Sequence, residues 1–300
     1  MTCFKLIERE KANYPAKMMC ELLDVSKSAF YAWRNPKRTD GRLAANREAI
    51  KAQVLELWEG SKKRFGGWSI WKRLTKKGVA VTLWLIRKLM HELKISGLAP
   101  KKKVVTTIVD PSASSRSDLL SGDFTAPTPT IKLAGDITYL KLGNHSTLYL
   151  AVVIDLCTRM VVGWALADHM KASLAVDALK KAWMAGFVAI GAIFHSDRGS
   201  QYTSKLFGQF AETISVRLST GRKATCYDNA VSESFFATMK KEWFYRESFN
   251  SREELERSLG RYIEIYYNRQ RPHSTLDGNT PYEEHQLHES HWEDILSAAA

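Results

Sequence analysis

The sequence predicts an α/β domain that follows a basic, all-helical N-terminal region. Helix-type spacing of apolar residues runs through the first third of the chain, whereas strand-like runs rich in Val, Ile, Leu and Tyr begin after about residue 130. Charge divides the chain similarly: residues 1–110 hold 24 Lys and Arg against 10 Asp and Glu, and the remaining 190 residues hold 20 against 22. A chain of 300 residues, 45% of them hydrophobic, is long enough for two or three domains.

Composition excludes several classes of protein. The four cysteines form no CxxC pair, so neither a disulfide framework nor a cysteine zinc site is indicated, and a reducing cytosol fits. No apolar run approaches the roughly 20 residues of a membrane span, and residues 1–17 lack the apolar stretch of a signal peptide. We therefore expect a cytoplasmic protein with no membrane partner. The basic third is the candidate polyanion binder, with a surface kept basic for solubility as the plainer alternative.

A helix-turn-helix is expected near the N-terminus. Apolar residues of residues 14–35 form two clusters that are separated by Asp24-Val25-Ser26. Ser26 is a plausible N-cap, which leaves Lys27 and Ser28 at the exposed start of the second helix, the end from which recognition helices usually touch DNA. Two packed helices without DNA contact would have the same pattern.

A second bihelical unit follows an amphipathic helix over residues 42–60. Phe65-Gly66-Gly67-Trp68 opens its first helix, Gly78 ends that helix, and Thr82 can cap the next one. Basic side chains on the outer faces suit phosphate contacts, although each taken alone is more often a solvated cation. These side chains are Lys72, Arg73, Lys76, Lys77, Arg87 and Lys88.

Beyond a linker rich in Ser and Pro, the pattern changes to that of an α/β domain. Its expected strands cover residues 131–141, 146–155, 159–167 and 190–195, and its expected helices cover residues 171–187, 204–213 and a long stretch from 229. Short connections between the first three strands favour an antiparallel meander.

Three carboxylates stand at informative places in this layout. Asp136 interrupts a strand-like run, Asp197 follows the fourth strand where an α/β sheet opens its crevice, and Glu233 lies little more than one turn into a helix that Asp228 or Asn229 can cap. Taken singly, each has a plainer explanation: an Asp of an edge strand, a turn Asp and a surface Glu.

In combination the carboxylates indicate phosphoryl transfer. Carboxylates from a first strand, a fourth strand and a later helix can converge on one site, where two Mg²⁺ ions about 3.5–4 Å apart would activate the attacking oxygen and stabilise the leaving one. Lys240 falls on nearly the same helical face as Glu233, because seven residues return to within roughly 20°. It would lie at the rim, near the phosphates of the substrate.

The motifs that carry these residues resemble the second-frame (OrfB) transposases of the IS-three family of insertion sequences. The matching segments are DITYL, HSDRGSQY, NAVSESFFATMKKE and YNRQRPHSTLDGNTP, and 35 residues separate Asp197 from Glu233, the spacing for which the Asp, Asp, Glu group of this family is known. The likeness covers roughly residues 15–285. One departure is Leu133-Ala134-Gly135, since family members often have a Trp two or three residues ahead of the first Asp.

The resemblance implies a ribonuclease H-like, integrase-type core with a mixed five-stranded sheet. It implies that Asp136, Asp197 and Glu233 are catalytic metal ligands for two Mg²⁺ ions, for which Mn²⁺ can substitute, and that Lys240 lies near DNA. It also makes Asp155 a structural turn residue. Arg271 and His273 either contact DNA or order the end of the chain.

The domain boundaries that follow are residues 1–40 for the helix-turn-helix, 41–110 for the basic helical DNA-binding domain, 111–125 for the linker, 126–285 for the core and 286–300 for a tail.

The expected partners are DNA, as terminal inverted repeats and target, and further copies of the chain on that DNA. The resemblance adds an upstream-frame helix-turn-helix and leucine-zipper protein, and a bacterial, nucleoid-associated location. The leading function is cleavage at element ends followed by strand transfer from a 3′-hydroxyl. Alternatives are a catalytically silent DNA-binding protein, against which the intact carboxylates argue, and a simple nuclease, which leaves the basic region unexplained.

Overall fold

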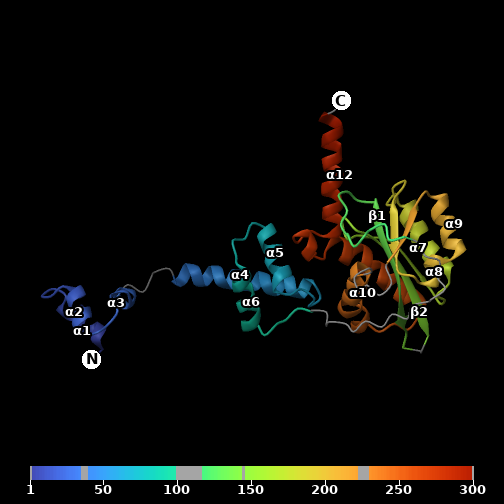
Figure 1. Ribbon diagram of the computed structural model, residues 1–300. Coiled ribbons are helices and arrows are strands. Elements are labelled where there is room, and N and C mark those ends of the chain that lie inside the picture. Colours follow the sequence, from blue (N-terminus) through green and yellow to red (C-terminus); the bar gives the residue numbers. More distant parts are fainter. Residues whose placement is uncertain (1, 35–39, 99–116, 144–145, 222–229, 299–300) are drawn as a thin grey trace.

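The computed structural model describes residues 2–34, 40–98, 117–143, 146–221 and 230–298, which form two small helical units and an α/β core (Figure 1). The predicted capping of a helix by Asp228 or Asn229 lies outside these residues. Within them, no helix is both long and apolar enough to cross a bilayer.

The first helical unit has a small core of its own. It consists of α1 (Cys3–Glu10), α2 (Ala16–Leu22) and α3 (Lys27–Arg34). The Ser26 hydroxyl accepts a hydrogen bond from the backbone N–H of Ala29 (3.4 Å), so the predicted N-cap is confirmed. The sequence pattern did not predict α1, although its Ile7 is fully buried. The core residues of the unit are Ile7, Met19, Cys20 and Phe30.

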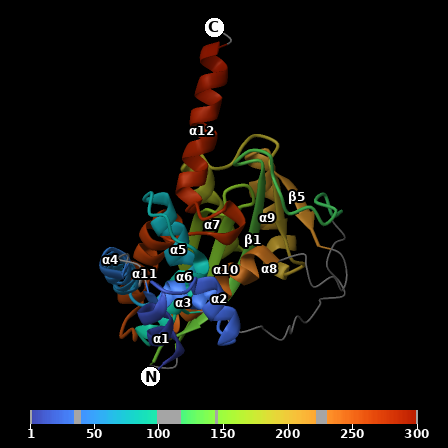
Figure 2. The ribbon, with the colours of Figure 1, turned by 90° about the vertical axis from the view of Figure 1, so that its left-hand side faces the viewer.

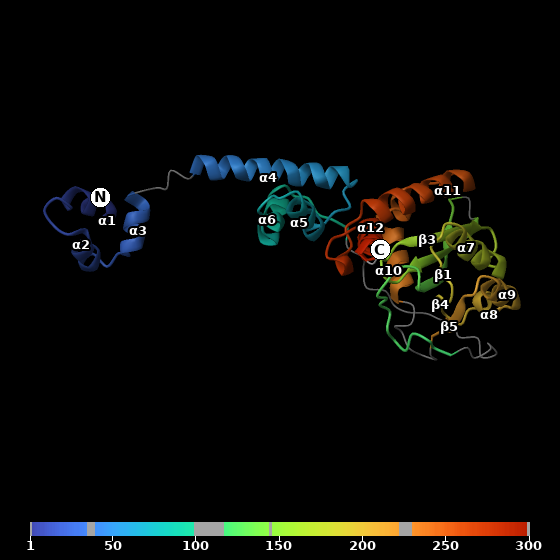
Figure 3. The same cartoon turned by 90° about the horizontal axis from the view of Figure 1, so that it is seen from above.

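The second helical unit contains the long α4 (Asp40–Gly60), α5 (Gly67–Lys76) and α6 (Leu83–Glu92). Gly78 ends α5 with a φ of +78°, a conformation that favours glycine. The Thr82 hydroxyl accepts from the N–H of Leu85 (3.2 Å) and caps α6, as predicted. Figure 3 shows α5 and α6 side by side against α4, toward the α/β core.

The core is built on a mixed five-stranded sheet with strand order β3-β2-β1-β4-β5. The meander of β1, β2 and β3 is antiparallel, as predicted, whereas β4 and β5 run parallel to β1. The bounds are β1 (Lys132–Lys141), β2 (Thr147–Asp155), β3 (Val161–Ala167), β4 (Ile193–Ser196) and β5 (Arg217–Thr220).

Helices cover both faces of the sheet (Figures 1 and 2). One face packs against α7 (Ala172–Met184), α8 (Ser200–Thr203) and α9 (Lys205–Thr213). The other face packs against α10 (Ala230–Glu242), α11 (Arg252–Gly260) and the π-helical segment Arg261–Tyr267. The apolar cluster on this second face also includes Phe65 and Ile70, so the second helical unit and the core share one buried interior.

Two predicted segments differ from expectation. Of the predicted linker, residues 117–125 are described, and they lie on the core: Leu120 is buried and the Phe124 ring packs edge-on against His195 (5.4 Å). Polar contacts hold the segment as well, since the N–H of Leu119 donates to the Ser219 hydroxyl (2.9 Å) and Lys132 lies 2.9 Å from Asp123, and none of these contacts has a periodic sequence pattern. The predicted tail begins at residue 286, but α12 (Pro281–Ala298) passes through that boundary and projects from the core (Figure 1).

Candidate active site and DNA-binding surfaces

The parallel pairing of β1 with β4 brings two of the predicted carboxylates together. Gly135 lies opposite Ser196 in this pairing, and Asp136 and Asp197 are the next residues of the two segments. Their backbones are therefore adjacent at the spacing of neighbouring strands, about 4.8 Å. The buried Tyr202 lies close to both: burial, and then the charges of Asp136 and Asp197, raise the pKa of its phenol well above the usual range.

Asp197 is held in the tight turn that follows β4. Its Oδ1 accepts a hydrogen bond from the backbone N–H of Gly199 (2.9 Å). A Cβ at Gly199 would lie 2.9 Å from the same oxygen, so only glycine fits without displacing the carboxylate. Burial raises the pKa of Asp197, and the Gly199 hydrogen bond lowers it less. A bound cation would favour the charged form, and this environment therefore suits a metal ligand.

Gly135, just before Asp136, lies against an aromatic ring of the neighbouring strand. A Cβ there would lie 2.1 Å from Cζ of Phe194, so the phenyl ring occupies the space over the glycine. Phe194 also packs against Phe207 (5.2 Å between ring centroids) in the core. The neighbouring strand therefore supplies the aromatic packing at this point.

Glu233 lies on the first turn of α10, in a partly exposed position. Val231 on the same turn packs against the cluster that contains Ala134, so this end of α10 faces the β1 end of the sheet. The expected convergence of all three carboxylates is not seen. Within the described ranges, no three His, Cys, Asp or Glu side chains form a group that could hold a metal ion. The pairing of β1 with β4 makes Asp136 and Asp197 neighbours, and carboxylate oxygens are ligands that suit Mg²⁺.

Lys240 connects α10 to β1 through Tyr139. Its ammonium group lies 4.6 Å from the ring centroid of Tyr139, three residues after Asp136. Both Tyr139 and the Lys240 side chain are accessible to solvent. The predicted position of Lys240 at the rim of the carboxylate site, and its contact with DNA, both stay predictions.

Asp155 is a structural residue, as the resemblance implied. Its Oδ1 accepts from the N–H groups of Cys157 (3.0 Å) and Thr158 (2.7 Å), and its Oδ2 accepts from the N–H of Thr130 (2.6 Å). The side chain is 1% exposed. Asp155 thus closes the turn from β2 to β3 and ties it to the start of β1.

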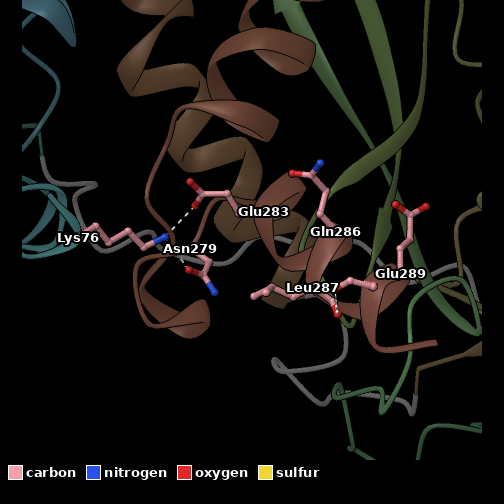
Figure 4. Close-up of a pocket in the computed structure, with 7 residues that line it drawn as sticks. Lys76, Asn279, Glu283, Gln286, Leu287 and Glu289 are labelled. Atoms are coloured by element: carbon pink, nitrogen blue, oxygen red, sulfur yellow. Dashed lines mark hydrogen bonds and ion pairs between the residues drawn. The ribbon is translucent and has the colours of Figure 1, made fainter. Parts of the chain in front are cut away.

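The basic face of α5, which was predicted to contact DNA, is occupied by the C-terminal segment of the chain (Figure 4). Lys76 donates to Asn279 (2.6 Å) and lies 2.9 Å from Glu283, while Lys72 lies 2.5 Å from Asp277. Arg73 donates to the backbone carbonyl of Gln270. These contacts span about 200 residues of sequence, which is why helix periodicity could not reveal them. Lys77, one residue beyond α5, is exposed.

Arg271 also lies inside the protein. Its Nε and a terminal nitrogen bind both carboxylate oxygens of Glu242 at 3.1 Å, and the Glu242 side chain is 7% exposed. Burial alone would lower the pKa of Arg271, but the charge and hydrogen bonds of Glu242 outweigh it and raise the pKa. The structure supports the ordering role for Arg271 and gives no support to the predicted DNA contact.

One exposed basic face is that of α6. Arg87 and Lys88 are exposed there together with Trp84 and His91, and these positions share a face because they lie three, four and seven residues apart. The Trp84 side chain is 68% exposed, and Lys88 lies 5.1 Å from its ring centroid. Lys27 and Ser28 at the start of α3 are exposed as well, with Ser28 bonded to Ser26 (2.7 Å).

The sequence pattern did not reveal two residues of the α6 face and one buried arginine. Trp84 and His91 were not predicted to lie on this face, although their offset from Leu85, Ile86 and Leu89 places them outward. Arg64 was hidden in a basic run, yet it is 7% exposed, unlike the exposed Lys62 and Lys63 before it.

Comparisons with known proteins agree with this architecture. Two families described as Integrase core domain match residues 126–226 and 214–281, and the HTH-like domain family matches residues 45–103. Transposase InsF for insertion sequence IS3A from Escherichia coli K12 is 34% identical over 278 residues, which cover 93% of this chain and 96% of that protein. The transposase for insertion sequence element IS904 from Lactococcus lactis is 32% identical over 244 residues, 81% of this chain and 96% of that protein. Among solved structures, the HTLV-2 integrase catalytic core domain in complex with magnesium is 15% identical, with a TM-score of 0.42 over 53% of this chain and 98% of that one.

Proposed function

Since this chain belongs to the IS3 family of insertion-sequence transposases, we propose that Asp136, Asp197 and Glu233 are the carboxylates with which it cleaves and joins DNA. The chain is a DNA transposase with a ribonuclease H-like, integrase-type core, and the comparisons favour no silent DNA-binding alternative. The observation that carries the assignment is the register of β1 and β4, which makes Asp136 and Asp197 neighbours.

The proposed reaction has two steps at one centre. A water molecule first cleaves the phosphodiester at an element end, and the 3′-hydroxyl that is released then attacks the target strand. Two Mg²⁺ ions, replaceable by Mn²⁺, would activate the attacking oxygen and stabilise the leaving one. The protein side chains position that chemistry. Asp197 is fixed by Gly199 and Asp136 by its strand, and Lys240, which contacts Tyr139 on the same strand, would stand at the rim near a substrate phosphate.

The proposed DNA interface is led by α6. Trp84, Arg87, Lys88 and His91 form an exposed basic and aromatic face on α6, the second helix of the α5–α6 pair within the region that matches the HTH-like domain, which is the position of a recognition helix. Lys27 and Ser28 on α3, together with Lys77, are further exposed candidates. Arg73 and Lys76 belong to the interface only if DNA displaces the C-terminal segment.

Assembly and setting follow from the same proposal. The substrates would be the terminal inverted repeats of the element and a target duplex, held by several copies of the chain. An upstream-frame helix-turn-helix and leucine-zipper protein would assist recognition of the element ends. Transposition would take place on the nucleoid in a bacterial cytoplasm.

The variant Asp197→Asn tests the triad. Full-length protein with this change should bind end DNA as the wild type does and lose cleavage by several orders of magnitude, because an amide is a poor ligand for a divalent ion. Asp177→Asn on the exposed face of α7 is the matched control and should cleave normally. Cleavage and joining are followed on labelled end fragments, and strand transfer by Asp197→Asn would disprove the assignment.

A further inference from the structure

Arg64 points into the protein from a turn that carries two exposed lysines. Lys62 and Lys63, just before it, have φ values of +56° and +63°. The backbone N–H of Arg64 donates to the Ser61 hydroxyl (3.1 Å), and its carbonyl accepts from the N–H of Leu98 (3.1 Å). Lys62 and Lys63, both in the left-handed region, reverse the chain direction between α4 and α5. The side chain of Arg64, which follows them, is therefore buried.

The guanidinium of Arg64 reaches the core of the catalytic domain. It lies 4.2 Å from the ring centroid of Tyr266 and 5.7 Å from that of Tyr262, both on the π-helical segment Arg261–Tyr267. Its Nε donates to the backbone carbonyl of Glu242 (2.9 Å), 178 residues away in the sequence. Glu242 is the last residue of α10, where carbonyls lack helical partners and a nearby cation is favourable.

The end of α10 is therefore held by two arginines. Arg64 binds the Glu242 carbonyl from the side of the DNA-binding unit, and Arg271 binds the Glu242 carboxylate from the C-terminal segment. Glu233 lies nine residues earlier on the same helix, about 14 Å away at 1.5 Å per residue. At that distance Arg64 cannot touch the reacting atoms, but it can set the position of the helix that carries Glu233.

We propose that Arg64 is a positioning residue that couples DNA engagement by the α4–α6 unit to the placement of Glu233 beside Asp136 and Asp197. The inference rests on the proposed function of the triad. Its structural basis is that the last residue of α10 is bonded to Arg64 of the α4–α6 unit, whereas Glu233 lies on the first turn of the same helix, and the described residues contain no group of three carboxylates that could hold a metal ion. DNA that moves the α4–α6 unit therefore moves α10 with it.

The variant Arg64→Lys tests the coupling in the full-length protein. Lysine keeps the charge but lacks the Nε–H and the flat surface that stacks on Tyr266. Three quantities are measured with end DNA. They are the affinity of the protein for that DNA, the cleavage rate at saturating DNA, and the backbone hydrogen exchange of residues 230–236, which is followed without divalent metal so that no cleavage occurs. Lys63→Met, which removes an exposed cation one residue away, is the matched control.

We expect Arg64→Lys to bind DNA within roughly threefold of the wild type while cleavage falls by roughly 10- to 100-fold, the scale of an ångström-sized misplacement. End DNA should protect residues 230–236 from exchange in the wild type and in Lys63→Met, and less in Arg64→Lys. Asp197→Asn should keep this protection without cleaving. If Asp197→Asn cleaves, the triad is wrong, whereas the protection data still decide the coupling.

Two results would overturn the inference. One is unchanged cleavage and unchanged protection in Arg64→Lys. The other is a loss of cleavage that follows a loss of thermal stability and is restored at lower temperature, since that pattern means a structural role alone. Tyr266→Leu removes the stacking partner from the core side and replaces Arg64→Lys if that variant does not fold. Tyr266→Leu should likewise reduce the cleavage rate while leaving the affinity for end DNA nearly unchanged.

Discussion

The ion pair between Arg271 and Glu242 is expected to matter for stability rather than for DNA affinity. Both side chains are largely removed from solvent, so truncating one leaves a buried charge without its partner. Arg271→Ala should lower the free energy of unfolding by about 3–5 kcal/mol. The double variant Arg271→Met/Glu242→Met should be less destabilised than the sum of the single changes, because neither charge is then left alone.

Denaturant titration of the two single variants and the double variant measures this coupling. Arg261→Ala, at a more exposed position, is the control and should have a small effect. If Arg271→Ala weakens end binding without changing the free energy of unfolding, the residue faces DNA and the ion pair is not its main contact.

His273 gives the fold a dependence on pH. Burial first, and then the charges of Arg271 and Arg159, lower its pKa from 6.5 to about 4. The unfolded chain therefore binds more protons than the folded chain between these values, and stability falls as pH drops from 6.5 toward 4, by up to about 1.4 kcal/mol per pH unit for one proton. His273→Gln should flatten this slope.

Thermal or denaturant unfolding at a series of pH values provides the test. His91→Gln on the exposed face of α6 is the matched control and should leave the slope as in the wild type. An equal slope in His273→Gln would mean that the neutral imidazole does not contribute to the acid sensitivity.

Among the helices, α6 rather than α5 is expected to bear the phosphate contacts. Each phosphate neutralised contributes roughly −0.9 to the slope of log K against log salt. Lys88→Ala and Arg87→Ala should therefore each make the slope shallower by about one. Trp84→Ala should weaken binding with little change of slope, because the indole carries no charge. Lys76→Ala should leave the slope unchanged, since Glu283 already neutralises Lys76.

End-fragment affinities at several salt concentrations give these slopes, with Lys180→Ala on α7 as a control remote from the HTH-like domain. A shallower slope in Lys76→Ala together with an unchanged slope in Lys88→Ala would move the interface to α5. It would also mean that DNA displaces Glu283 from Lys76.

Local pattern predicted most elements because each has its own period or cap. Thr82 and Ser26 identified the starts of α6 and α3, and alternating apolar runs identified β1 to β3. Strand β5 was expected only through the family resemblance, because Arg217–Thr220 is four residues long and has a single aliphatic side chain. Helix α1 was missed, since a short N-terminal helix without a capping side chain has little signal.

The site could be predicted in part. The sequence motifs indicated the three proposed carboxylates, but the adjacency of Asp136 and Asp197 depends on the parallel pairing of β1 with β4, which no local pattern encodes. The roles of Arg64, Lys76 and Arg271 depend on partners 178, 203 and 29 residues away. A basic residue has the same appearance in sequence whether it faces DNA or a buried carboxylate.

At the scale of the whole molecule, the two N-terminal units are attached differently to the core. The unit of α1 to α3 has its own core of Ile7, Met19, Cys20 and Phe30, whereas the α4–α6 unit shares an apolar cluster with α10 and inserts Arg64 beside Tyr266. Removing residues 1–110 would therefore uncover apolar surface of the core as well as remove DNA contacts. Such a deletion cannot separate binding from folding.

A shorter truncation separates the two effects. A chain that starts at Asp40 should keep the thermal midpoint of the remaining protein within a few degrees, because the core of α1 to α3 is separate from the other clusters. Its affinity for end DNA should fall, and its salt dependence should be shallower by about one, since Lys27 is lost. Ser28→Ala in the full-length chain is the comparison variant, and it should reduce the affinity for end DNA less than the truncation does. A large drop in the thermal midpoint of the truncated chain would show that α1 to α3 pack on the rest of the protein. An unchanged salt dependence of DNA binding would confine that binding to the α4–α6 unit and the core.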